Sequence, residues 1–277
     1  MLLRMVTLLQ FPVRPTVWLP VALMVLLAWT VTTASGQWPP DPETAGRGGA
    51  AGATGGILSP LRPAHLPVDG TWHVRLDHHV PFGVTEASTV GARFGRSNGQ
   101  STWLASTKAT RFDAYQAVFF ALSYMRPLTL AQGVRAGASF GWTHERMGLL
   151  GARRTPVSAL GVNWHAREGT SVAFHLLNYR ATRLHGWVVA ADGTYDPGAH
   201  WPLLHATVSI HPDFGPAWHI GSTWKAVERM WIDIGGAGNP FRTAASIRFR
   251  SGTLFARFAF EWQPDPGISR WISIGWS

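Results

Sequence analysis

The feature that most constrains this chain is a two-residue alternation of apolar and polar side chains, which begins near residue 71. Between residues 134 and 145, for example, Phe140 and Trp142 fall on even positions, and Arg135 and Ser139 fall on odd ones. A β-strand points successive side chains to opposite faces, so this period predicts strands with one apolar and one polar face. The same pattern recurs at 72–80, 203–211 and 242–250.

The alternating segments are numerous and closely spaced, which predicts an all-β antiparallel up-and-down barrel. Fourteen segments can be counted, of which the one at 187–191 is the weakest, and twelve remain if two weak segments are loops. Single-chain bacterial barrels have even strand numbers, so either count is allowed. Short glycine-containing connections such as 97–100, 167–169 and 250–252 favour tight reversals between neighbours. The segments begin near residues 71, 86, 101, 112, 132, 157, 170, 187, 203, 217, 229, 242, 253 and 269.

Aromatic content favours a transmembrane barrel over a soluble sheet. The chain has 15 Trp and 14 Phe but only 4 Tyr, and charged residues make up 14% of it. Aromatic rings are enriched where protein meets the membrane–water interface, and lipid-facing strands alternate as these do. We therefore expect a barrel in the outer membrane of a Gram-negative bacterium, in contact with outer-membrane lipid. The alternative is a soluble periplasmic or surface β-protein that binds a partner or has a structural role.

Residues 1–70 differ in composition from the rest and divide into two segments. Residues 1–36 contain Arg4 and Arg14, an apolar core, and the small-x-small sequence Ala34-Ser35-Gly36, which is typical of a secretory signal peptide. Residues 37–70 are rich in Pro and Gly and predict a linker or a plug. The barrel then occupies residues 71–277. The chain has no Cys, so neither disulfides nor thiolate chemistry contributes.

The formal charge of +9 comes almost wholly from arginine, because Lys108 and Lys225 are the only lysines. The longest basic run is Arg153-Arg154, which argues against nucleic-acid binding, where basic residues usually cluster. Charges that face lipid are costly, so basic residues within strands are expected to face the lumen. They either line a water-filled path or form a packed network with acidic partners. The candidate lumen residues are Arg75, Arg93, Arg135, Lys225, Arg242, Arg248, Arg250 and Arg257.

Neither a metal site nor an active site is predicted. His73, Asp77 and His79 share one strand face, but successive same-face residues lie about 7 Å apart, which favours a hydrated lumen wall over a set of metal ligands. No pattern provides a nucleophile with a base and an orienting group, so we expect no enzymatic activity and no cofactor.

Several strand-and-turn segments resemble the PorV/PorQ-like outer-membrane proteins of Bacteroidota-type bacteria, a family distantly similar to the FadL fatty-acid transporters. This resemblance implies an outer-membrane location and either transport of a small amphipathic or anionic solute or a part in type IX-like protein export, with secretion-system or exported proteins as partners. The chain departs from this family's pattern in two places. It lacks the Asn-Pro-Ala-Gly-like element before the first strand, and it ends in Trp276-Ser277 in place of Phe. The resemblance is carried by residues 159–165, 170–178, 221–224, 235–242, 247–249 and 261–269.

The cleavage signature ending at Gly36 gives the first prediction. We expect signal peptidase to cut after this residue, so that the mature chain begins at or near Gln37. N-terminal sequencing of protein purified from membranes measures this directly. An intact Met1 would contradict both the signal peptide and the export route that a barrel needs.

Overall fold

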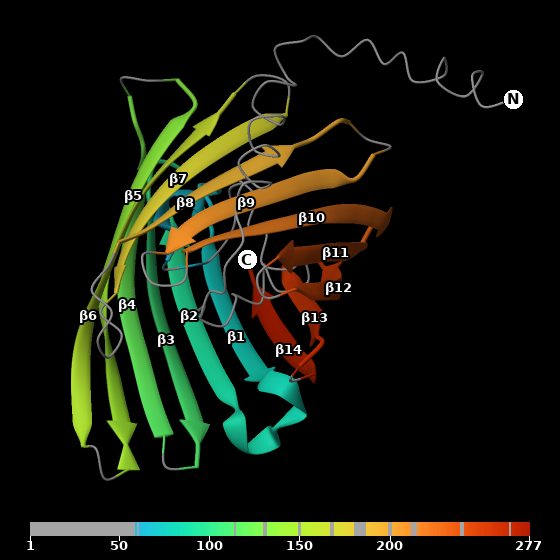
Figure 1. Cartoon of the computed structure of the whole chain (residues 1–277). Helices are drawn as coiled ribbons and strands as arrows, with labels where there is room; N and C mark the ends of the chain where they lie inside the picture. The colour runs from blue at the N-terminus through green and yellow to red at the C-terminus, as the bar shows by residue number, and fades with distance from the viewer. Residues whose placement is uncertain are drawn as a thin grey trace, which may run out of the picture.

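The structure is a computed structural model, and it shows a single barrel wall made of strands that follow one another in chain order (Figure 1). It describes residue 59 and residues 61–113, 115–129, 132–148, 151–166, 169–179, 187–198, 201–211, 215–238, 241–265 and 267–277. The expected signal peptide at 1–36 and residues 37–58 lie outside this part. The described strands are β1 (Trp72–Val80), β2 (Thr89–Ser97), β3 (Thr102–Phe112), β4 (Tyr115–Pro127), β5 (Val134–Met147), β6 (Ala152–His165), β7 (Thr170–Tyr179), β8 (Trp187–Tyr195), β9 (Leu203–His211), β10 (Gly215–Val227), β11 (Met230–Gly238), β12 (Arg242–Ser251), β13 (Leu254–Gln263) and β14 (Gly267–Trp276).

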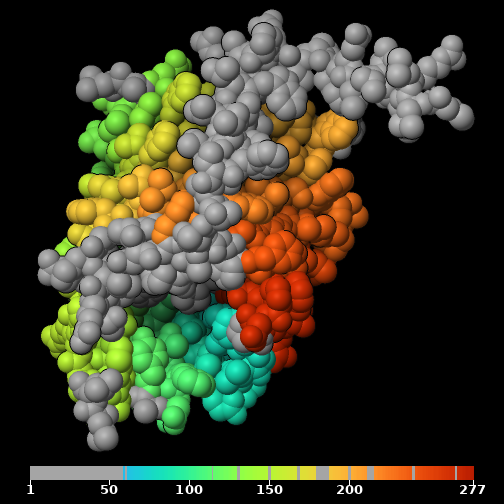
Figure 2. All heavy atoms as spheres, in the orientation of Figure 1, coloured from blue at the N-terminus to red at the C-terminus, as the bar shows by residue number. Residues whose placement is uncertain are grey.

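Closure of the sheet is made by antiparallel pairing between its first and last strands. In this seam Val74 of β1 is opposite Trp276 of β14, and Val80 is opposite Arg270. Each other strand pairs with its neighbours in sequence, so the described strands form a closed fourteen-stranded meander. The last strands, drawn in red, also lie beside the blue-green first strands in the space-filling view (Figure 2). The predicted all-β antiparallel barrel is therefore confirmed, including the weak segment near residue 187, which is β8.

The β12–β13 hairpin illustrates how the sequence makes these reversals. Ser251 is paired with Leu254, which leaves only Gly252 and Thr253 in the turn. Gly252 has φ of 59°, a conformation that glycine adopts at no steric cost. The glycine predicted to permit a reversal here therefore does so.

The two faces of the wall have opposite chemistry. Phe140 is 65% exposed on the outside of β5, whereas its neighbours Ser139 and Gly141 face inward and are buried. On β12, Thr243, Ala245 and Ile247 are exposed outward, while Arg242, Ala244 and Ser246 are buried. This arrangement, apolar outside and polar inside, is that of a membrane barrel and the reverse of a soluble protein core.

Five exposed tryptophans form a girdle near one end of the outer surface. They occupy outward positions near the end of the barrel where β1 begins and β14 ends. Such a girdle matches the level at which amphipathic rings meet lipid headgroups. At its edge the guanidinium carbon of Arg96 lies 4.7 Å from the ring centroid of Trp72. The girdle is formed by Trp72, Trp103, Trp164, Trp224 and Trp276, each about half exposed.

Residues 61–70, called the inner segment below, precede β1 and lie inside the barrel. They include the 3-10 turn η3 (Pro63–His65), whose three residues are all buried. Two further 3-10 turns, η4 (Pro81–Gly83) and η5 (Thr85–Ala87), connect β1 to β2. No helix in the described part of the chain is long and apolar enough to span a membrane.

A substitution on the outer face tests its contact with lipid. Ile247→Arg, near the middle of β12, is expected to destabilise the inserted barrel by about 2–4 kcal/mol, because an arginine near the bilayer midplane must leave water. Folding yield in lipid vesicles and heat-modifiable migration in detergent gels measure the loss. The conservative change Ile247→Leu is the matched control, and equal yields for both variants would contradict lipid exposure.

Candidate functional site in the barrel lumen

The lumen wall carries acidic side chains that are bound by arginine and, at Asp77 and Asp233, also by hydroxyl groups. Asp77 of β1 accepts hydrogen bonds from Arg75 Nε at 2.8 Å and from Ser273 Oγ at 2.7 Å. Arg93 Nη2 of β2 lies 3.2 Å from the other oxygen of this carboxylate. All these groups are buried, and each charge needs such partners because water is largely excluded from it.

Asp233 and Glu261 are the centres of two similar groups farther round the wall. Asp233 of β11 accepts hydrogen bonds of 2.6 Å from Thr223 and Ser246, and Arg257 Nη2 lies 3.4 Å from its Oδ2. Glu261 of β13 lies 3.5 Å from Arg242 Nη1. The packed network that the sequence allowed is therefore present along part of the lumen.

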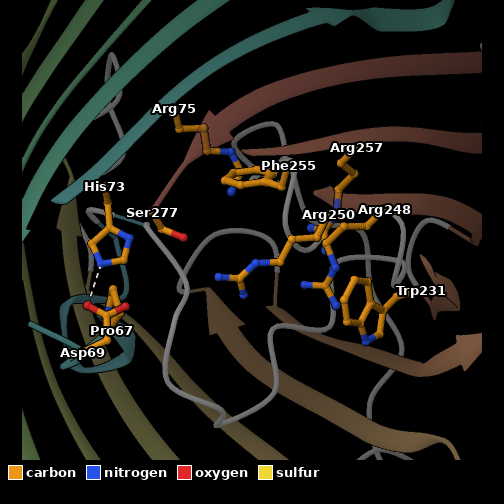
Figure 3. Close-up of a pocket in the computed structure, with 10 residues that line it drawn as sticks. All are labelled: Pro67, Asp69, His73, Arg75, Trp231, Arg248, Arg250, Phe255, Arg257 and Ser277. Atoms are coloured by element: carbon orange, nitrogen blue, oxygen red, sulfur yellow. Dashed lines mark hydrogen bonds and ion pairs between the residues drawn. The ribbon is translucent and has the colours of Figure 1, made fainter. Parts of the chain in front are cut away.

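Beside this network lies a cavity of about 330 Å³ with a strongly basic lining (Figure 3). Phe255 and Trp231 provide aromatic surface, and each has an arginine over its ring: Arg75 at 5.4 Å from the centroid of Phe255 and Arg248 at 4.9 Å from that of Trp231. Arg250 donates through Nε to the carbonyl of Gly252, and Figure 3 shows its guanidinium extending into the same space. The lining consists of Pro67, Asp69, His73, Arg75, Trp231, Arg248, Arg250, Phe255, Arg257 and Ser277.

Asp69 is the carboxylate of this lining, and local bonds stabilise its charge. Partial burial acts to raise the pKa of Asp69, but hydrogen bonds from Thr71 and His73 lower it and outweigh burial. The bond between His73 Nε2 and Asp69 Oδ1 is 2.9 Å long. Asp69 is thus already occupied, and the arginines dominate the charge that the cavity presents.

The eight basic residues singled out from the sequence all fall on inward positions, but they are not all together. Four of them, Arg75, Arg248, Arg250 and Arg257, line the cavity. Arg93 and Arg242 belong to the acid-centred groups. Lys225 lies near the end of β10, opposite Trp231 in register, and is exposed, whereas Arg135 on β5 is half-buried. Whether these groups line a path for solute stays a prediction.

The inner segment is attached to the opposite side of the wall by a compact polar cluster. Arg62 Nη1 lies 2.6 and 2.5 Å from the two carboxylate oxygens of Asp192 on β8. His65 Nε2 lies 2.8 Å from His175 Nε2 on β7, and Thr207 of β9 donates to Asp192 at 2.6 Å. Burial lowers the pKa of His65 to about 4, although its bond to Asp192 opposes this. Its imidazole is therefore neutral at neutral pH.

Two glycines make room for the inner segment. Gly137 of β5 and Gly161 of β6 are paired in register, so together they form a flat patch on the inner wall. A Cβ at Gly137 would lie 2.6 Å from the carbonyl carbon of Pro63, and one at Gly161 would lie 3.1 Å from Ala64 Cβ. A side chain at Gly137 would therefore overlap η3, and one at Gly161 would crowd both Ala64 and His175, whose Nδ1 would lie 2.6 Å away.

Apolar contacts complete the attachment. Leu66 packs against Leu104 and Met125, which point inward from β3 and β4, and all three are buried. Thr102 also donates a hydrogen bond to the carbonyl of Pro67. Residues 61–70 are thus held in the lumen from the glycine patch to the edge of the basic cavity.

The sequence did not single out several of these residues. His175 and Asp192 stand at inward positions of two strands, but only the register shows that they meet at β7 and β8. His65 and Arg62 lie in a segment without periodicity, and Trp231 and Phe255 were not separated from other aromatics. The three residues considered for metal binding are apart: His73 bonds Asp69, Asp77 belongs to the arginine group, and His79 stacks on Trp271 at 4.4 Å between ring centroids.

Comparison of the whole fold with solved structures shows an outer-membrane-type barrel. The monoaromatic hydrocarbon channel CymD aligns with a TM-score of 0.63 at 12% identity, covering 88% of this chain and 99% of that one. The toluene transporter TbuX of Ralstonia pickettii aligns with a TM-score of 0.62 at 11% identity, covering 85% of this chain and 97% of that one. The outer membrane protein Omp33 of Acinetobacter baumannii aligns with a TM-score of 0.54 at 9% identity, covering 76% of this chain and 98% of that one. No family model and no curated protein sequence matches the chain. The narrower PorV/PorQ-like relation stays a prediction.

The glycine patch gives a test of how the inner segment is held. Gly137→Ala is expected to displace η3 without opening the barrel, because its methyl group would overlap Pro63. Gly91→Ala is the matched control, since a Cβ there meets only ordinary contacts, the nearest being Lys108 Cγ at 3.4 Å.

Because the chain has no native Cys, the reactivity of one introduced Cys can report whether the inner segment has moved. Leu66→Cys, at a fully buried position, should react several-fold faster with a maleimide in the Gly137→Ala background than in the Gly91→Ala background. Equal rates in both backgrounds would mean that the glycine patch does not position the segment.

Proposed function

We propose that this protein is an outer-membrane channel that passes small amphipathic anions, and that the basic cavity binds them on their way through the lumen. The observation that carries the proposal is the combination of aromatic rings and guanidinium groups around one cavity of about 330 Å³. The proposal concerns solutes with an apolar body and one carboxylate or similar group.

The cavity chemistry supports this class of solute. Arginine presents a planar set of donors that matches a carboxylate, and the faces of Trp231 and Phe255 offer apolar surface beside it. Arg75 and Arg257 are paired with Asp77 and Asp233, and Asp69 is bound to His73, so Arg248 and Arg250 add positive charge to this lining. Fixed positive charge in a confined space raises the local concentration of anions.

The outer surface supports the membrane location. Lipid-facing apolar side chains and a tryptophan girdle would have no use in a soluble periplasmic protein, where such a surface would aggregate. The aligned structures, named as a monoaromatic hydrocarbon channel and a toluene transporter, favour transport of small solutes that contain an apolar ring. A part in protein export remains a prediction of the PorV/PorQ resemblance, and the small cavity favours the solute channel over it.

The test compares a charged with an uncharged probe of similar shape. In vesicles that contain the folded protein, benzoate should enter faster than in empty vesicles, and Arg248→Gln with Arg250→Gln should lower that protein-dependent rate several-fold. The reason is the loss of two positive charges from the cavity, so the difference should shrink as salt screens the remaining ones. Toluene entry should not change in the variant.

A second double variant, which removes two positive charges outside the cavity, controls for the change in net charge alone. Arg126 and Arg146 are exposed on outward positions of β4 and β5, and replacing both with Gln should leave benzoate entry unchanged. Equal benzoate entry in the cavity variant and the wild type would contradict anion binding there. Well-folded protein that passes neither probe would contradict the channel itself.

A further inference from the structure

The cluster that attaches the inner segment to the wall also has the composition of a metal site. It brings together two imidazoles and one carboxylate from three separate elements: His65 of η3, His175 of β7 and Asp192 of β8. All three side chains are fully buried, and their ligand atoms lie within 4.8 Å of one another. Among the described residues this is the one such group of three.

The distances are close to those that a coordinated ion would impose. His65 Nε2 and His175 Nε2 are 2.8 Å apart, and they lie 3.3 and 3.2 Å from Asp192 Oδ2. Ligands about 2.0–2.1 Å from a tetrahedral zinc ion are about 3.3 Å from each other. The three atoms therefore need to move only a few tenths of an ångström to share one ion.

Hydrogen bonds among the two Nε2 atoms and Asp192 Oδ2 cannot satisfy all three atoms at once. A neutral imidazole carries one proton, so if both Nε2 atoms are protonated, two N–H groups point at each other across 2.8 Å. If only one is protonated, the lone pair of the other faces the carboxylate oxygen as well as its neighbour. Neither His Nδ1 atom has a hydrogen-bond partner among the described residues, so the ring orientations are not set from that side. A cation placed between the three atoms would satisfy all three lone pairs.

We propose that a divalent transition-metal ion of the zinc class binds between His65 Nε2, His175 Nε2 and Asp192 Oδ2, and so fastens the inner segment to the barrel wall. Nitrogen and oxygen donors in this ratio suit zinc and its neighbours better than calcium or magnesium, which prefer oxygen alone. The bond from Thr207 to Asp192 Oδ1 leaves Oδ2 directed at the two histidines. Thr207 thereby orients the carboxylate.

Arg62 is the competitor for this position. Its Nη1 atom lies against both oxygens of Asp192, and a guanidinium and a metal ion cannot both hold Oδ2 closely. The side chain of Arg62 is 19% exposed, so it is less confined than Asp192 and can turn away when an ion enters. Removing Arg62 should therefore strengthen metal binding, an outcome that a merely structural role of the cluster does not produce.

The experiment measures Zn²⁺ binding to the full folded chain in detergent by titration calorimetry, with Co²⁺ as a second probe whose visible spectrum reports nitrogen ligation. We expect one ion per chain. His65→Gln, His175→Gln and Asp192→Asn should each weaken Zn²⁺ binding at least about 10-fold, because even outer-shell partners of metal sites cost 10- to 100-fold when lost. Arg62→Gln should bind Zn²⁺ more tightly than the wild type.

His205→Gln is the matched control, because His205 also faces the lumen but bonds Thr223 at 3.0 Å and is not part of the cluster. Its Zn²⁺ affinity and Co²⁺ spectrum should equal those of the wild type. Equal affinity in the wild type and in the three ligand variants, or a loss caused equally by His205→Gln, would overturn the proposal. If a ligand variant does not fold, the response of Arg62→Gln decides: no increase in affinity overturns the site.

Discussion

The rest of this structure depends on closure of the backbone hydrogen-bond network between β1 and β14. In hydrocarbon an unpaired N–H or C=O costs several kcal/mol, so a sheet can span a membrane only if it has no edge. The register from Val74 opposite Trp276 to Val80 opposite Arg270 removes that edge. Closure then fixes the direction of every side chain, because the alternation must send apolar groups to lipid and polar groups inward.

The inward polar groups create a second constraint, since charges in a narrow lumen need partners. Asp77, Asp192 and Asp233 each meet an arginine together with a hydroxyl group from Ser or Thr. These groups lie on different parts of the wall and cross-link neighbouring strands. Arg248 and Arg250 lie at the same end of the lumen as Arg75 and Arg257, and these four side chains line the basic cavity.

Much of the fold follows from the sequence because side-chain alternation and turn residues, which produce the strands and the reversals, are local features. The period of two assigns the face of each residue, and turn chemistry such as that at Gly252 assigns the reversals, so strand number and lumen-facing arginines could be predicted. Register across strands is not local. The meeting of His175 with Asp192, and of Gly137 with Gly161, depends on how far each strand is shifted against the next. A segment without periodicity, such as 61–70, gives no signal of where it lies.

The position of that segment relates the two interior sites to each other. Arg62 and His65 bind the wall at β7 and β8, Leu66 packs on β3 and β4, and Pro67 with Asp69 borders the basic cavity near β12 and β13. Only three residues lie between His65 and Asp69, which is too short a stretch for one end to move far while the other stays fixed. We therefore expect a change in how His65 is held to alter the lining of the cavity. If the proposed anion binds the arginines near Asp69, the same connection would let it act on the cluster at Asp192, since coupling between two sites is reciprocal.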